Sequence, residues 1–160
     1  PNRGAFVVEL GDREARDLLE VRVVLEEFIA RQAAERRTDE QLARLKAIVG
    51  HGSQHIRGAR PSDLAVMNSD FHQALAEASQ SPTASDLVEQ LRTRSELVYA
   101  GRLAKRAASS WTEHAEVVDA VERRDVDAAG EAIRSHLLRA AESWQSDTAP
   151  APPLRPIQKI

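Results

Sequence analysis

The sequence predicts an all-α protein, an antiparallel bundle of six to seven helices. Alanine, leucine, arginine and glutamate dominate the composition, and all four residue types favour helices. Apolar residues recur three and four positions apart over most of the chain, which is the period of one helix face. Aromatic residues make up only 4% of the sequence, too few for an aromatic-rich β-sandwich. A length of 160 residues suits one domain with one core.

The first two helices are predicted over residues 12–36 and from Thr38 onward. Thr38 and Gln41 have the spacing of a capping box, in which each side chain bonds the other residue's backbone N–H. Gly50 and Gly52 weaken the second helix near its end. The apolar stripes are Leu18, Leu19, Val21, Leu25, Phe28, Ile29 and Ala33 on the first helix, and Leu42, Leu45 and Ile48 on the second.

Four further helices are predicted over residues 61–78, 81–105, 110–123 and 125–144. Their starts are marked by proline in the first turn or by a capping side chain, both typical of helix N-termini. These residues are Pro61, Pro82, Ser110 (with Glu113 as a second capping box) and Asp125.

The two ends of the chain have a different character. Gly4 and the apolar residues 5–8 predict a turn and a short β segment with no partner strand, so residues 1–9 resemble the end of an element that lies upstream. The domain proper is expected over residues 10–147. Residues 148–160 are rich in proline, which cannot continue a helix, so this tail is expected to be disordered.

Charge and composition exclude several classes of function. A net charge of −3 argues against a surface that grips a phosphate backbone. The absence of cysteine excludes disulfides, thiolate catalysis and cysteine-bound metals. No apolar run approaches the ~20 residues that cross a bilayer, and the start does not resemble a signal peptide. The expected location is the cytoplasm, without a membrane partner.

Three of the five histidines fall where core residues are expected. His72, His114 and His136 lie on or beside the apolar stripes of three different helices. A single such histidine is usually a core residue hydrogen-bonded to a carbonyl group. Three buried imidazoles would each need partners, and one shared metal ion would satisfy all of them. The spacing alone leaves both interpretations open.

Two other pairs of residues have helical spacing. Asn68 precedes His72 by four residues, so one helix could present both side chains to a single ion. His51 and His55 are also four apart, but the glycines around them indicate a fraying helix end, and we expect surface positions.

Arg22 and Glu26 have the spacing of a helical ion pair, yet Arg22 borders the apolar stripe and could instead offer its guanidinium to a carboxylate ligand. Glu113 is expected on the solvent side of its helix, about 100° from His114. With no carboxylate beside the histidines to act as a general base, the sequence argues against an enzyme.

These residues resemble a known family. Residues 18–36, 67–79 and 109–138 resemble the FCD domain, the C-terminal effector-binding domain of the FadR-type branch of GntR transcription regulators. The motifs that carry the resemblance occur in order along most of the chain: Asn68, Phe71-His72, His114, Arg123-Arg124-Asp125 and His136-Leu137.

The resemblance implies an antiparallel helical bundle that dimerises and holds a divalent metal, zinc or nickel, through Asn68, His72, His114 and His136. It also implies a small carboxylic acid bound by the metal and Arg22 together, which changes DNA binding by a winged helix-turn-helix. Residues 1–9 resemble the last wing strand of that module, which is otherwise absent from this sequence. Many members have aspartate where Asn68 stands, so this site carries one negative charge less.

Two alternatives to this regulator remain: a small three-histidine metalloenzyme and a metal-free helical interaction module. We also expect a homodimer, because the helix over residues 81–105 has more apolar surface than a six-helix monomer needs.

Overall fold

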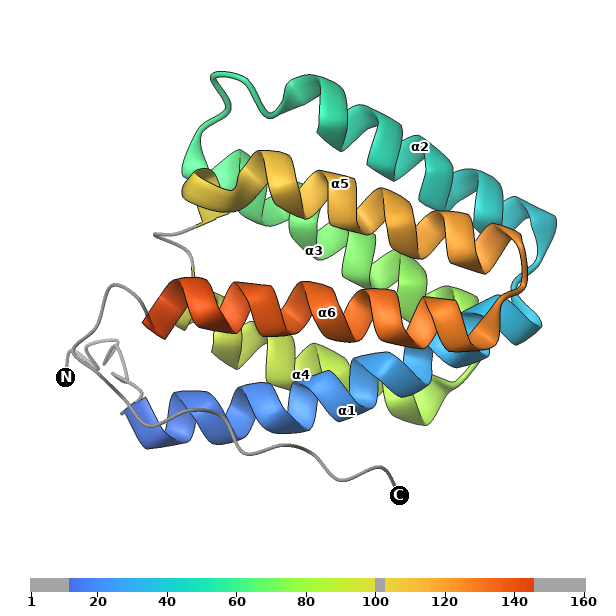
Figure 1. The fold of residues 1–160 in the computed structure, drawn as a ribbon, viewed down its shortest axis with the longest axis horizontal. Helices are drawn as coiled ribbons and strands as arrows, with labels where there is room; N and C mark the ends of the chain where they lie inside the picture. The colour runs from blue at the N-terminus through green and yellow to red at the C-terminus, as the bar shows by residue number, and fades with distance from the viewer. Residues whose placement is uncertain (1–11, 100–102, 146–160) are drawn as a thin grey trace, which may run out of the picture.

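The computed structural model of the protein describes residues 12–99 and 103–145. All regular secondary structure in these residues is α-helical, and the predicted bundle is confirmed (Figure 1). The six helices are α1 (Asp12–Arg36), α2 (Asp39–His55), α3 (Pro61–Ala78), α4 (Pro82–Tyr99), α5 (Leu103–Glu122) and α6 (Val126–Gln145).

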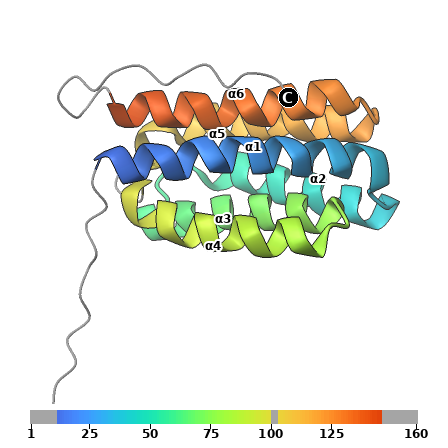
Figure 2. The same cartoon turned by 90° about the horizontal axis from the view of Figure 1, so that it is seen from below.

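Successive helices run in alternating directions along the long axis of the molecule (Figure 1). α1 packs against α3, α4, α5 and α6, and α5 packs against α1, α2, α3 and α6. Seen from below, α3 and α4 form one side of the bundle and α5 and α6 the opposite side, with α1 between them (Figure 2). The faces of α1, α3, α5 and α6 that point toward one another therefore form part of the buried core.

Most helix starts are set by the predicted local chemistry. The Thr38 hydroxyl accepts a hydrogen bond from the Gln41 backbone N–H at 3.1 Å, and the Gln41 side chain accepts one from the Thr38 N–H at 2.9 Å. Pro61 and Pro82 are the first residues of α3 and α4. Asp125 accepts a bond from the Ala128 N–H at 3.0 Å and so caps α6.

The boundary between α4 and α5 was predicted wrongly. The fourth helix was expected to reach Lys105 and the fifth to begin at Ser110, but α4 ends at Tyr99 and α5 begins at Leu103. Ser110 lies inside α5 and is buried, so it caps no helix. Alanines between Leu103 and Ser110 favour helix, so α5 begins two turns before the predicted start at Ser110. Serine is typical of caps but is tolerated inside a helix.

The core contains most of the predicted stripes, with one correction on α1. Leu18, Leu19, Ile29 and Ala33 are buried as expected, whereas Val21 and Phe28 are 50% and 45% exposed. The helix therefore has a second apolar face that turns away from the core. Large side chains that are fully buried include Phe71, Ile29, Leu45, Leu75, Ile133 and Leu137.

The expectations for residues 1–9 and 148–160 lie outside the described residues. Among the helices that are described, none combines the length and the apolar character of a membrane span.

Candidate functional site

Three histidines from three helices meet in the interior of the bundle. His72 of α3, His114 of α5 and His136 of α6 are all buried, as their positions on the apolar stripes predicted. One ring nitrogen of each lies within 4.8 Å of the others. The Nε2 atoms of His114 and His136 are 3.3 Å apart. The structure therefore forms the histidine cluster that the sequence could only suggest.

Aromatic side chains hold the central ring of this cluster. The His114 ring stacks on Phe71, with centroids 3.8 Å apart and planes 17° from parallel. Trp111 meets the same imidazole edge-on at 4.9 Å and 89°. These contacts exclude water from one side of the cluster and leave the ring few orientations.

Two buried carboxylates orient the other two rings. His72 Nδ1 lies 2.6 Å from Glu26 Oε2, and His136 Nδ1 lies 2.7 Å from Glu113 Oε2. An ionised carboxylate can only accept hydrogen bonds, so both Nδ1 atoms carry the proton. In a neutral ring held in this way the Nε2 atom has a lone pair, the arrangement typical of histidines that bind a metal.

The nitrogen atoms of the cluster fit a cation. Within the described residues, His72 Nε2 and His114 Nδ1 are buried and have no hydrogen-bond partner. A buried polar atom without a partner is costly, and a metal ion would satisfy the His72 nitrogen. Two nitrogens bound to one tetrahedral zinc at ~2.0–2.1 Å are about 3.3 Å apart, as His114 Nε2 and His136 Nε2 are here.

The electrostatics of the site favour neutral imidazoles. Burial lowers the pKa of His72 to about 4, although the Glu26 carboxylate acts in the opposite direction. Burial also lowers the pKa of His114 well below its ordinary value, and the neighbouring histidines add to the shift. Neutral imidazole is the form that binds metals, so a metal does not have to displace a proton from a charged His72 or His114 near neutral pH.

The carboxylates remain ionised despite their burial. Burial alone would raise the pKa of Glu26, but the Arg22 charge and the hydrogen bonds from His72 and Arg22 lower it overall. The pKa of Glu113 is also lowered: its bond from His136 and the Arg106 charge outweigh burial.

Glu113 corrects two expectations. It was expected on the solvent side of its helix, yet it is 7% exposed and lies between α5 and α6. Arg106 and Arg139 contact its oxygens at 2.8 and 2.9 Å. Because α5 packs against four helices, its buried arc is wide enough to include a residue about 100° from His114. The expected absence of carboxylates beside the histidines was therefore also wrong.

Arg22 forms the ion pair that was one of its two interpretations, and its contact with a carboxylate ligand stays a prediction. It forms the ion pair with Glu26, Nε to Oε1 at 2.5 Å, but the pair is buried and adjoins His72 through the same carboxylate. Arg22 Nη1 also donates to Ser95 Oγ of α4 at 3.1 Å. The role of Glu26 and the contact with Ser95 were not predicted. The sequence signal for Glu26 was its position four residues after an arginine at the stripe border.

The remaining predicted residues lie near the cluster or far from it. Asn68 is half-buried on α3, one turn before His72, and its coordination of an ion stays a prediction. His51 and His55 are exposed, as predicted, and their rings stack on each other at 4.1 Å.

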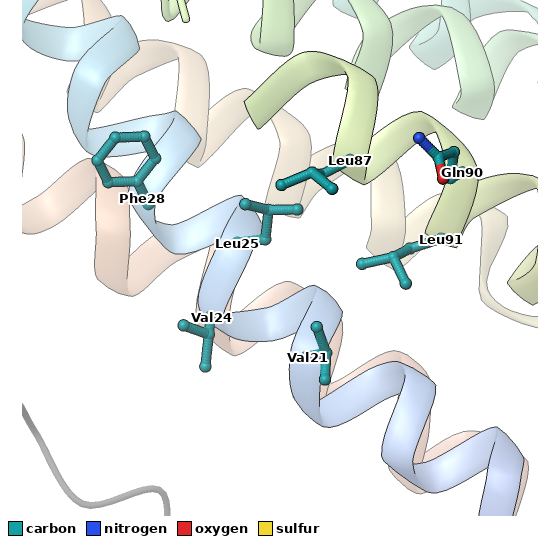
Figure 3. Close-up of a pocket in the computed structure, with 7 residues that line it drawn as sticks. All are labelled: Val21, Val24, Leu25, Phe28, Leu87, Gln90 and Leu91. Carbon is teal, nitrogen blue, oxygen red and sulfur yellow. The ribbon is translucent and has the colours of Figure 1, made fainter. Parts of the chain in front are cut away.

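An apolar groove lies on the outer surface of α1 and α4 (Figure 3). It has a volume of about 600 Å³, and Gln90 is the one polar residue among the described residues that line it. The other lining residues are Val21, Val24, Leu25 and Phe28 of α1 and Leu87 and Leu91 of α4. On α4, Leu87 is 49% exposed, and α1 contributes more than half of the described lining residues.

Sequence comparisons identify related regulators. Residues 17–139 match the FCD domain family. The chain is 30% identical over 131 residues to an HTH-type transcriptional repressor, NanR, from Cronobacter sakazakii, covering 79% of this chain and 50% of that protein. The NanR of an Enterobacter species is 31% identical over 134 residues, with the same coverage. The chain thus spans about half the length of the curated relatives it matches.

Structural comparisons support the fold. Escherichia coli McbR/YncC superimposes with a TM-score of 0.77 at 19% identity, covering 88% of this chain and 68% of that one. Streptococcus agalactiae GntR gives 0.73 at 26% identity, with 85% and 62% coverage. The metal-free FCD domain of TM0439 gives 0.67 at 22% identity, with 86% and 96% coverage.

Proposed function

Because the chain belongs to the FCD domain family, whose matched members are transcription regulators rather than enzymes, we propose that it is the ligand-sensing and dimerisation domain of a GntR-type regulator. In this proposal a divalent metal and a small organic acid bind the domain and change DNA binding by an N-terminal winged helix-turn-helix. The observation that carries the proposal is the meeting of three buried histidines from three helices, two of which, His72 and His114, have a lowered pKa.

His72, His114 and His136 would hold the metal, with the side-chain oxygen of Asn68 as a fourth ligand. Three imidazoles suit zinc or nickel, and both ions can leave positions for oxygen ligands. The bound ion would supply a positive centre that attracts an anionic oxygen. Glu26 and Glu113 support the ligand rings and do not replace them, since each contacts a histidine through Nδ1.

The acid would be recognised by the metal and Arg22 together. The site would carry the charge of the ion next to a guanidinium, which favours a small mono- or dicarboxylic or hydroxy acid. A long acyl chain fits less well, because the histidines occupy the centre of the bundle.

A second copy of the chain would cover the groove between α1 and α4. Val21, Val24, Phe28 and Leu87 are each about half exposed and line one groove, and contiguous exposed apolar patches often mark an interaction surface. Burying this face against its symmetry mate would form a two-fold interface.

Metal analysis and thermal unfolding test the proposed site. Protein purified without chelator should contain about one zinc or nickel ion per chain. Acetate, lactate, succinate or citrate should raise the melting temperature of metal-loaded protein, and a chelator should remove most of that shift. Arg22→Ala should weaken acid binding by about 1.5–3 kcal/mol, the value of a charge-assisted hydrogen bond. Protein without metal and without metal-dependent shifts would instead support the metal-free interaction module, and turnover by the metal-loaded protein would support the metalloenzyme.

Sedimentation tests the proposed interface. The wild-type chain should sediment as a dimer at micromolar concentration, and Phe28→Asp should give the 17.6 kDa monomer. Val66→Asp is the matched control, because Val66 is 61% exposed but does not line the groove. A wild-type chain that stays monomeric would contradict the proposed interface.

A further inference from the structure

Glu26 contacts two different functional groups with its two oxygens. Oε1 accepts a hydrogen bond from Arg22 Nε at 2.5 Å, and Oε2 accepts one from His72 Nδ1 at 2.6 Å. The side chain is 2% exposed, so neither contact is screened by water. One carboxylate on α1 therefore fixes a ring on α3 and a guanidinium on its own helix.

Glu113 offers a comparison within the same site. It also accepts a bond from a histidine Nδ1, and it is also buried. Its other described partners are Arg106 of α5 and Arg139 of α6, and no contact between Glu113 and Arg22 is present among the described residues. The two glutamates thus support equivalent rings but differ in their link to Arg22.

We infer that Glu26 is a positioning residue that fixes the metal-binding nitrogen of His72 and the guanidinium of Arg22 relative to each other. Metal affinity and acid affinity therefore both depend on it. This inference rests on the proposed metal and acid site. The carboxylate has no proton to donate, so His72 must keep its proton on Nδ1 and present Nε2 to the ion. The same carboxylate holds Arg22 from one side, while Ser95 Oγ on α4 holds Nη1 from the other.

The described contacts of Arg22 use Nε and Nη1. A guanidinium has five N–H groups in a fixed plane, so fixing two of its nitrogens also fixes the direction of the third. An acid that binds the ion and Arg22 at once needs this direction to be constant. Loss of Glu26 should therefore weaken acid binding even when the metal site is full.

Glu26→Gln tests the inference, with Glu113→Gln as the matched control. The two partners contact different oxygens of Glu26, and in glutamine one of these positions is a donating NH₂, so either His72 Nδ1–H or Arg22 Nε–H would face a donor in place of an acceptor. Nitrogen-15 NMR of the metal-free protein should show Nδ1–H on His72 and a protected Nε–H on Arg22. Glu26→Gln should change at least one of these signals, and Glu113→Gln should leave both in place.

Binding measurements complete the test. Both variants should bind zinc about 10–100-fold more weakly than wild type, the usual effect of removing a carboxylate that supports a ligating histidine. At saturating zinc, succinate should bind Glu26→Gln at least about tenfold more weakly, and Glu113→Gln within about threefold of wild type. If Glu26→Gln does not fold, Glu26→Asp keeps the charge but is too short to reach both partners, and the same results are expected.

The two proposals fail in different ways. A wild-type protein with no zinc-dependent succinate binding contradicts the proposed acid site. The Glu26 inference is overturned if the folded variant keeps both NMR signals, or keeps wild-type zinc affinity, or binds succinate like the wild type at saturating zinc. The NMR result needs neither metal nor acid.

Discussion

The protein contains two groups of neighbouring histidines, and only one has the surroundings of a binding site. His51 and His55 lie one turn apart on α2, stack on each other and are exposed. His55 Nδ1 lies 2.7 Å from the His51 carbonyl oxygen of its own helix. The other three come from different helices, are buried, and have glutamates behind two of the rings. Helical spacing brings the two exposed imidazoles together, and the packing of three helices brings the buried ones together. Only the buried group has carboxylates that orient its rings.

The sharpest test of this difference removes one histidine from each group. His136→Ala should abolish metal-dependent stabilisation, which is about 2.7 kcal/mol when free metal is 100-fold above its dissociation constant. His55→Ala should keep that stabilisation and change stability by less than about 0.5 kcal/mol, as is usual for an exposed residue. Thermal unfolding with and without zinc measures both. Equal losses in the two variants would show that the surface pair binds the ion.

The buried group should also make the metal-free protein sensitive to acid. The pKa of His72 falls from its ordinary 6.5 to about 4 because of burial, so the unfolded chain binds a proton that the folded chain does not between these values. Stability should therefore decrease as the pH falls from about 6.5 to about 4, by about 3 kcal/mol from His72. Urea unfolding of metal-free protein at several pH values measures it. His72→Gln should flatten this slope, and an unchanged slope would contradict the assignment.

The sequence predicted the arrangement of elements better than the surroundings of the site. The bounds of α1 and the capping of α2 follow from local chemistry, and both were predicted correctly. Ser110 has the sequence of a cap but sits inside α5, because helix formers precede it. The burial of Glu113 depends on how many helices surround α5, and the contact between Glu26 and His72 joins residues 46 positions apart. Neither can be derived from the periodicity of one helix.

Gly52 lies beside the exposed histidines and faces Trp111, which packs on the buried His114, and its substitution should have a smaller effect. Gly52 lies between His51 and His55, and a Cβ at this position would collide with the Trp111 ring, which packs on His114. Gly52→Ala should cost about 1–3 kcal/mol of stability through overpacking. Gly50→Ala on the same helix meets nothing within 4 Å and should stabilise the protein by about 0.5–1 kcal/mol. Denaturant unfolding of the pair measures the contrast, and equal effects would contradict the packing of Trp111.

The smallest effect is expected for Arg139, which contacts the buried site from the protein surface. Arg139 contacts Glu113 Oε1 at 2.9 Å, but its side chain is 48% exposed, whereas Arg106 contacts the same carboxylate with only 17% of its side chain exposed. An exposed ion pair contributes about 0.2–1 kcal/mol, because water screens it and the long side chain loses freedom. Arg139→Gln should therefore reduce zinc affinity by less than about fivefold, and 0.5 M salt should mask the change. Arg106→Gln should have the larger effect, since its guanidinium is less screened. If Arg139→Gln weakened zinc binding as much as Arg106→Gln, the support of His136 would extend to the surface, and burial would not be what separates the two histidine groups.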